Sequence, residues 1–358
     1  MSKNILWTPA KDQIDQAQIT HFRELINRKY GLQLDGYEAL YQWSLSNGAD
    51  FWDEMWRFGK IISHQNFSSV VDDLTKMPGA KWFDGSLLNY AENLLRYRDE
   101  RIAIHFRGED QIERSLSYSE LYTEVAHAAY ALKAAGVKRG DRVAGFIPNL
   151  PETIIAMLAT ASLGAIWSSS SPDFGIKGVL DRFSQIEPKI IFAADGYFYG
   201  GKHFDTLEKL GSILSELPTV EQVVIVGYTG KPDLTKLPGS LHWDDFLDNP
   251  ASEIDFEPLP FDQPLYIMYS SGTTGLPKSI VHSAGGTLIQ HLKEHLLHCD
   301  LKREDTLFYF TNCGWMMWNW LVSGLASGAT LVLYDGNPFY PSPTALWTMA
   351  ENLNISIF

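Results

Sequence analysis

From about Arg101 onward, short apolar runs alternate with segments long enough to form helices. The strand-like runs are residues 142–147, 188–193, 222–226, 265–269, 306–310 and 330–333. After the first run, Pro151 opens an apolar segment that extends to about Leu163, and proline suits the first turn of a helix. Strands that alternate with helices pair mainly in parallel, because each crossover helix returns the chain to the same edge of the sheet. The sequence therefore predicts an α/β fold with mainly parallel sheets flanked by helices.

The N-terminal residues follow a different pattern. Phe22, Leu25, Ile26 and Tyr30 recur at helical spacing, and an aromatic cluster follows between positions 51 and 58. This pattern indicates helices that dock on a larger body through aromatic side chains. We expect two parts: residues 1–95, which are helical, and residues 96–358, which carry the sheet.

Composition and charge narrow the class of protein. The 358 residues include 29 Lys and Arg against 43 Asp and Glu, which gives a formal net charge of −14. This balance offers no basic footprint for nucleic acid or anionic lipid, so a phosphate-bearing ligand needs local donors. Cys299 and Cys313 form no C-x-x-C pair, which disfavours a disulfide framework and a thiolate zinc site. Without a signal peptide or a membrane-spanning stretch, the sequence predicts a cytoplasmic protein with no membrane or nucleic-acid partner.

The segment Tyr269–Lys278 (YSSGTTGLPK) carries the clearest chemical signal, and it follows an apolar run directly. Glycines let backbone N–H groups converge on phosphate oxygens, hydroxyl groups add donors, and Lys278 supplies positive charge. Pro277 precedes the lysine, so this is not a Walker A loop. We expect a helix to follow the loop with its N-terminus facing the phosphates. The residues predicted to bind phosphate are Ser270, Ser271, Gly272, Thr273, Thr274, Gly275 and Lys278.

This loop resembles the phosphate-binding signature of the adenylate-forming (ANL) superfamily, although Ser279 stands where many members have glycine. Residues 82–95 and Leu163–Trp167 resemble segments of its acetyl-CoA synthetase group. Ser171–Gly175 (SPDFG) resembles the acetoacetate-activating ligases within that group. The resemblance implies that residues 96–358 are part of the large N-terminal domain of the adenylate-forming fold, incomplete at the C-terminal end.

The same resemblance implies a two-step reaction. Acetoacetate attacks the α-phosphorus of MgATP to give an acyl-adenylate and pyrophosphate, and the thiol of coenzyme A then displaces AMP. Members of the superfamily also carry an aromatic-Gly-x-Thr-Glu motif, a ribose-binding Asp and a C-terminal domain with a Lys, and we find no counterpart of these in the sequence. We therefore assign no catalytic residue. We expect this chain to be inactive alone and to need the missing C-terminal part of the same enzyme.

A segment rich in Trp and Met, residues 312–320, matches the region that helps to line the acyl pocket in such enzymes. Trp315, Met316 and Met317 would then border the acyl group, since flexible thioethers suit a four-carbon chain. The alternative is a buried helix whose aromatic side chains pack in the core.

Three other interpretations stay open. The first is a related ligase that acts on acetate or propionate, and the second is a nonenzymatic nucleotide-binding fragment. The third is a zinc hydrolase, because His291, Glu294 and His295 fit the H-x-x-E-H pattern, with His298 one turn further on nearly the same face. We favour a solvated helix surface for these histidines over a zinc site, and we predict no metal ligand among them.

Overall fold

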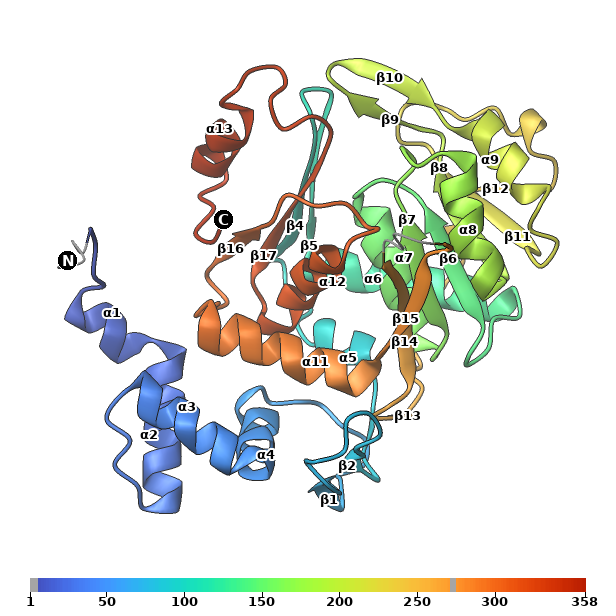
Figure 1. Ribbon diagram of the computed structural model, residues 1–358. Helices are drawn as coiled ribbons and strands as arrows, with labels where there is room; N and C mark the ends of the chain where they lie inside the picture. Colours follow the sequence, from blue (N-terminus) through green and yellow to red (C-terminus); the bar gives the residue numbers. More distant parts are fainter. Residues whose placement is uncertain (1–5, 271–274) are drawn as a thin grey trace.

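The computed structural model describes residues 6–270 and 275–358. Its centre is a seven-stranded sheet (Figure 1). The strands, in spatial order, are β12 (Leu241–His242), β11 (Gln222–Val226), β8 (Ile190–Ala194), β6 (Arg142–Phe146), β7 (Ile166–Ser170), β14 (Pro264–Ser270) and β15 (Lys278–Ser283). Neighbouring strands are parallel except for β14 and β15, which are antiparallel.

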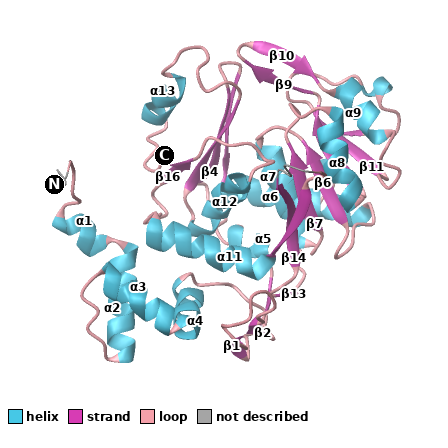
Figure 2. Cartoon of the chain, in the orientation of Figure 1, coloured by secondary structure: helices cyan, strands magenta, loops and turns pink. Residues whose placement is uncertain are grey.

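A second sheet of four strands stands beside the first. Its spatial order is β16 (Thr306–Phe308), β17 (Thr330–Asp335), β4 (Ile102–Gly108) and β5 (Ile112–Ser117), and only the β4–β5 pair is antiparallel. The remaining strands form two-stranded ribbons: β1 (Ser69–Val71) with β2 (Trp82–Asp84), β9 (Gly196–Tyr199) with β10 (Lys202–Asp205), and β3 (Leu87–Leu88) with β13 (Leu259–Pro260). The mainly parallel α/β fold expected from the sequence is therefore confirmed (Figure 2).

Helices cover both faces of the larger sheet. Because side chains alternate along a strand, Val143 of β6 belongs to one hydrophobic cluster and the adjacent Ala144 to another. The first cluster includes residues of α6 (Tyr118–Ala134), α7 (Pro151–Ser162) and α10 (Trp243–Leu247). The second includes residues of α8 (Ile176–Ile186) and α9 (Leu207–Leu214), and the 3-10 turn η1 (Leu234–Lys236) packs nearby. Every residue of α7 is buried, as its apolar sequence requires.

The N-terminal residues form helices that dock below α11 (Figure 1). These helices are α1 (Lys11–Gln16), α2 (Gln18–Tyr30), α3 (Tyr37–Ser46) and α4 (Gly48–Phe58), and α5 (Tyr90–Leu94) follows the ribbons. Phe83 lies at the centre of the aromatic contacts, with its ring centroid 4.7 Å from that of Trp56 and 4.9 Å from that of Phe261. The segment is thus helical over α1–α4 and again at α5, with short strands between them, and aromatic side chains do join it to the sheet-bearing part.

The remaining helices are α11 (Ala284–Lys293), the π-helical turn η2 (Glu294–His298), α12 (Met316–Ser323), the 3-10 turn η3 (Gly324–Ser327) and α13 (Ala345–Asn352). The expected helix directly after the phosphate loop is wrong. Lys278 begins strand β15, which pairs back along β14, and α11 starts only at Ala284. A six-residue strand is roughly 20 Å long, so the N-terminus of α11 lies at the far end of the hairpin. Among the described residues, no helix is long and apolar enough to cross a membrane.

Candidate functional site

The predicted phosphate loop joins β14 to β15. Ser270 and Lys278 face each other as the last paired residues of the two strands, and Gly275 has a φ of 152°. Lys278 and Gly275 are exposed, so both are open to a ligand from solvent. Ser271, Gly272, Thr273 and Thr274 lie outside the described residues. What the structure establishes is therefore how the two ends of the loop are held.

Helix α8 holds both ends of this loop. The Gln185 amide nitrogen donates to the carbonyl oxygen of Pro277 (2.9 Å), and its oxygen accepts from the Ser279 hydroxyl (3.1 Å). On the other strand, the hydroxyl of Tyr269 donates to the carbonyl oxygen of Arg182 (3.3 Å) and accepts from Ser168 (3.2 Å). Burial raises the pKa of Tyr269 to about 12, so this hydroxyl stays protonated and keeps its donor.

A cavity of about 440 Å³ opens near the loop. It is lined by residues that follow the carboxyl ends of the parallel strands: Asn149 after β6, Ser171 after β7, Tyr309 after β16 and Gly336 after β17. Because Tyr266 pairs with Trp167, the register between β14 and β7 brings Ser270 level with Ser171. The loop and this edge cavity, as we call it, therefore share the sheet edge at which open α/β sheets bind ligands.

The three residues predicted for the acyl pocket are divided by the structure. Trp315 and Met317 line the edge cavity, whereas Met316 is not among its lining residues and is 45% exposed at the first position of α12. Trp318, which follows Met317, is fully buried. Trp315, which precedes α12, and Met317 in its first turn thus line the cavity, and the core interpretation holds for Trp318 but not for Trp315, which is 62% exposed.

Asn149 is a buried residue that sequence reasoning missed. Its side-chain oxygen accepts a hydrogen bond from the indole nitrogen of Trp318 (2.8 Å), and its nitrogen lies near the carbonyl oxygens of Thr311 (3.4 Å) and Tyr334 (3.5 Å). Cys313 makes similar long-range contacts. Its thiol donates to the carbonyl oxygen of Ile147, and its own carbonyl oxygen accepts from the Ser169 hydroxyl. These contacts join segments more than 140 residues apart, so no local pattern reports them.

An acidic group forms another part of the wall. Asp335 ends β17 and lines the edge cavity, and burial, together with the charges of Glu109 and Asp173, raises its pKa to about 7. Glu109 itself is buried and accepts hydrogen bonds from the backbone nitrogens of Gly200 (2.6 Å), Gly201 (2.8 Å) and Asn337 (2.8 Å). Glu109 thereby ties the turn between β9 and β10 to the segment after β17.

His291 and His295 of the H-x-x-E-H pattern lie in the interior, away from this edge, so the solvated helix surface expected for them is wrong. A ring nitrogen of His291 is hydrogen-bonded to the Ser323 hydroxyl (2.7 Å), and one of His295 to the Trp320 carbonyl (2.9 Å). The π-helical turn changes the angular spacing, so His298 is exposed and does not share their face. Within residues 6–270 and 275–358, no group of three or more His, Cys, Asp or Glu side chains could hold a metal ion.

Comparison with known proteins places this geometry in a family. Residues 91–358 match the AMP-binding enzyme family. The chain belongs to this family. Residues 37–94 match the N-terminus of acetyl-coenzyme A synthetase. The resemblance to adenylate-forming enzymes is therefore confirmed.

Individual relatives show which members of the family this chain is similar to. The chain is homologous to acetoacetyl-CoA synthetases: it is 47% identical to that of Rattus norvegicus over 100% of this chain and 54% of the relative. Its identity to that of Rhizobium meliloti (strain 1021) is also 47%, over 99% of this chain and 54% of the relative. The solved acetoacetyl-CoA synthetase from Streptomyces lividans superposes with a TM-score of 0.94 at 42% identity, covering 99% of this chain and 55% of that one. The chain thus spans about half the length of the relatives it matches.

Proposed function

We propose that this chain provides the ATP-binding and acyl-binding half of an acid–CoA ligase that activates acetoacetate. The observation that carries the proposal is the common sheet edge: the loop that ends at Lys278 and the edge cavity lie side by side at the carboxyl ends of β14 and β7. The phosphates of a nucleoside triphosphate on the loop would then lie next to a carboxylate in the cavity. Homology to acetoacetyl-CoA synthetases supports acetoacetate as the acid.

In the proposed reaction, a carboxylate oxygen of acetoacetate attacks the α-phosphorus of ATP, and pyrophosphate leaves. The sulfur of coenzyme A then attacks the carbonyl carbon of the acyl-adenylate, and AMP leaves. Lys278 would neutralise charge on the phosphates, and the hydroxyl and backbone donors of the loop would orient them. Mg²⁺ enters the proposal as part of the MgATP substrate, bridging phosphate oxygens as this cation commonly does.

The edge cavity would hold the acyl group between Trp315 and Met317. A four-carbon acid fills only part of about 440 Å³, so selection of the acid requires polar contacts as well as shape. Thr311 and Asn312 line the cavity, and their hydroxyl and amide groups would hydrogen-bond the second carbonyl of acetoacetate, which acetate and propionate lack. We therefore expect these polar residues to matter more for acetoacetate than for the simpler acids.

Nucleotide binding is the first test. Isothermal titration of the 358-residue chain with MgATP should show binding that Lys278→Ala weakens at least ~10-fold, because a charge-assisted contact to phosphate is lost. Lys133→Ala is the matched control, since Lys133 is exposed and pairs with Asp255 (3.1 Å) on another face. Equal affinities in the wild type and the Lys278→Ala variant would contradict the assignment of the loop.

Acid selectivity is the second test. The chain is fused to the part of the rat relative that lies beyond the aligned region, and pyrophosphate release is measured with acetoacetate, acetate and propionate. We expect kcat/KM to favour acetoacetate by ~10-fold or more. A preference for acetate or propionate would identify the related ligase instead. MgATP binding without any acid-dependent release would identify a nonenzymatic nucleotide-binding chain.

A further inference from the structure

A second cavity, of about 520 Å³, lies where the N-terminal helices meet residues 91–358. We call these residues the AMP-binding part, because they match that family. The walls of the cavity come from α2, the end of α4, the residues after α5, η2 and η3. None of its lining residues belongs to the edge cavity or to the loop at Lys278. We call it the basic cavity, because its charged lining residues are Arg57, Lys60, Arg96, Lys302 and Arg303.

The charge of this cavity is unusual for the molecule. In a chain with 43 acidic and 29 basic residues, five bases and no acid appear among its described lining residues. Three of the bases form ion pairs: Arg57 pairs with Asp53, Lys302 with Asp300, and Arg303 with Asp99. Lys60 and Arg96 have no ion-pair partner in the part of the chain that the structure describes. About two positive charges are therefore left uncompensated.

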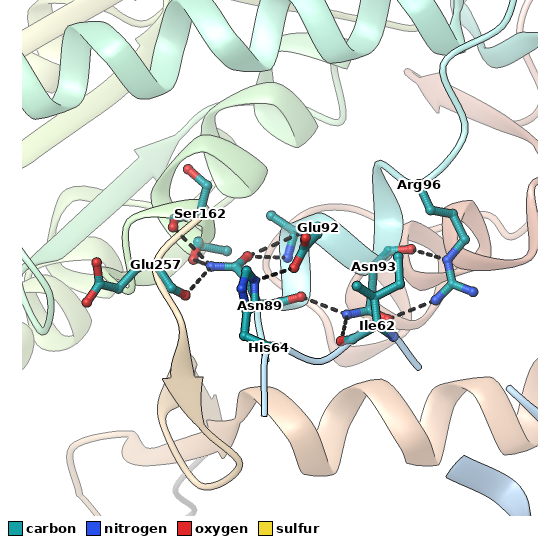
Figure 3. A network of polar contacts seen from close by, with 10 residues as sticks. Ile62, His64, Asn89, Glu92, Asn93, Arg96, Ser162 and Glu257 are labelled. Atoms are coloured by element: carbon teal, nitrogen blue, oxygen red, sulfur yellow. Dashed lines mark hydrogen bonds and ion pairs between the residues drawn. The ribbon is translucent and has the colours of Figure 1, made fainter. Parts of the chain in front are cut away.

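Arg96 is fixed in position without an acid. Its Nε donates to the carbonyl oxygen of Asn93 (2.8 Å), one terminal nitrogen donates to the Asn93 side chain (2.8 Å), and the other reaches the carbonyl oxygens of Gly59 (3.3 Å) and Lys60 (3.2 Å). Asn93 is held in turn by the backbone of Ile62 (Figure 3). These carbonyl contacts orient the guanidinium but do not neutralise it, so an anion in the cavity would meet a preorganised positive charge.

Two polar atoms of the lining residues lack partners. The Nε of Arg303 and the hydroxyl of Ser327 are buried and have no hydrogen-bond partner among the described residues. Arg303 is otherwise well fixed, because its guanidinium pairs with Asp99 and stacks 4.4 Å from the ring centroid of Tyr97. Buried donors without partners are uncommon in folded proteins, and rotation of the Ser327 side chain would bring its hydroxyl to the acceptor oxygens of a ligand in the cavity.

The rest of the wall is apolar, with Leu25, Phe58, Leu292 and Leu296 among its residues. We propose that the basic cavity binds a small organic phosphate monoester with an apolar substituent. A phosphate monoester carries a charge near −2 at neutral pH and three acceptor oxygens, which match the uncompensated charge of Lys60 and Arg96 and the unpartnered hydroxyl of Ser327. Its apolar substituent would contact the leucine side chains. Such a ligand touches both parts of the chain, so its binding would stabilise their docking.

Phenyl phosphate is the probe, because it combines the phosphate dianion with one apolar ring. Titration calorimetry with the 358-residue chain should show about one site per chain. Lys60→Asn should weaken binding by ~10-fold and Lys60→Asp by more, since one removes and the other reverses a charge at the cavity. Lys60 has a φ of 49°, a conformation that Asn and Asp tolerate, so both variants should fold. Lys133→Asn, an exposed lysine on α6, should bind like the wild type.

Two comparisons separate this site from the others. The Lys278→Ala variant should keep its affinity for phenyl phosphate while it loses affinity for ATP, so failure of the proposed function leaves this test intact. Ser327→Ala is a second variant with minimal change in volume, and it should also weaken binding. Equal affinity for phenyl phosphate in the wild type, Lys60→Asp and Ser327→Ala would overturn the proposal. Phenol binding as tightly as phenyl phosphate would overturn it too, because the cavity would then recognise only the ring.

Discussion

At the scale of single residues, the edge cavity depends on side chains that tie distant segments together. Asn149 contacts Trp318, Thr311 and Tyr334, and Glu109 accepts three backbone hydrogen bonds from two loops. The sequence shows only that an Asn follows a strand and that a Glu follows another. Their roles arise from strand order, which local patterns do not encode. The phosphate loop was different, because its residue types are contiguous and carry their chemistry with them.

Asp335 should make the stability of the protein depend on pH. Its pKa is raised from 3.8 to about 7 in the folded state, so the folded protein binds a proton more tightly than the unfolded chain does. Its contribution is therefore fully present below pH ~4 and is lost as the pH rises toward 7. Asp335→Asn should remove this loss and stabilise the protein at pH 8, by at most ~4 kcal/mol.

Urea unfolding at pH 5 and pH 8 checks this expectation for Asp335. The variant should show a smaller fall in the free energy of unfolding between the two pH values than the wild type. Asp248→Asn is the control, because Asp248 is exposed and lies outside the edge cavity. A wild type and an Asp335→Asn variant with parallel pH profiles would show that this carboxyl group is ionised normally.

At the scale of elements, the strands and α7 could be predicted because their apolar runs are local. The segment after the phosphate loop could not, since Lys278–Ser283 pairs with β14 and only then does α11 begin. Ile280 and Val281 are β-branched and favour a strand. This signal was overlooked because a helix was expected to begin directly after the loop. The π-helical turn after α11 could not be predicted either, because no local pattern indicates it. It places His298 on a different face from His291 and His295.

The α11–η2 element should make the protein sensitive to acid. Burial lowers the pKa of His291 to about 3 and that of His295 to about 4, so both are neutral in the folded protein. Their stabilising contribution is complete above pH ~6.5 and is lost as the pH falls toward 4, because the unfolded chain then binds more protons. This change has the opposite sign to that of Asp335.

His295→Gln tests the acid sensitivity. Glutamine keeps a donor for the Trp320 carbonyl but cannot take up a proton, so the free energy of unfolding should decline less steeply between pH 6.5 and 4.5 than in the wild type. We expect a cost of about 1–2 kcal/mol at pH 7 from lost packing against Trp320. His21→Gln, a change at an exposed histidine of α2, should leave the slope as it is. An unchanged slope in His295→Gln would mean that His295 is not a source of the acid sensitivity.

At the scale of the whole molecule, the family and the fold could be predicted from contiguous segments, and the sites between segments could not. The bases that line the basic cavity are spread along the sequence from Arg57 to Arg303. In the sequence, nothing distinguishes any of them from an ordinary surface cation. The same holds for the junction of the two parts. The sequence shows aromatic residues in the first 95 positions, but their partner Phe261 lies far along the chain.

Phe83 should be the residue on which that junction depends most. It is 1% exposed, and its ring lies against Trp56, Phe67 and Phe261. Phe83→Ala removes the ring that joins the N-terminal segment to the AMP-binding part, at a cost of about 3–5 kcal/mol. Limited proteolysis should then cleave within residues 1–95 faster than in the wild type. Leu74→Ala is the control, because Leu74 is 53% exposed. Equal cleavage rates in the Phe83→Ala variant and the wild type would show that the segment stays docked without this ring.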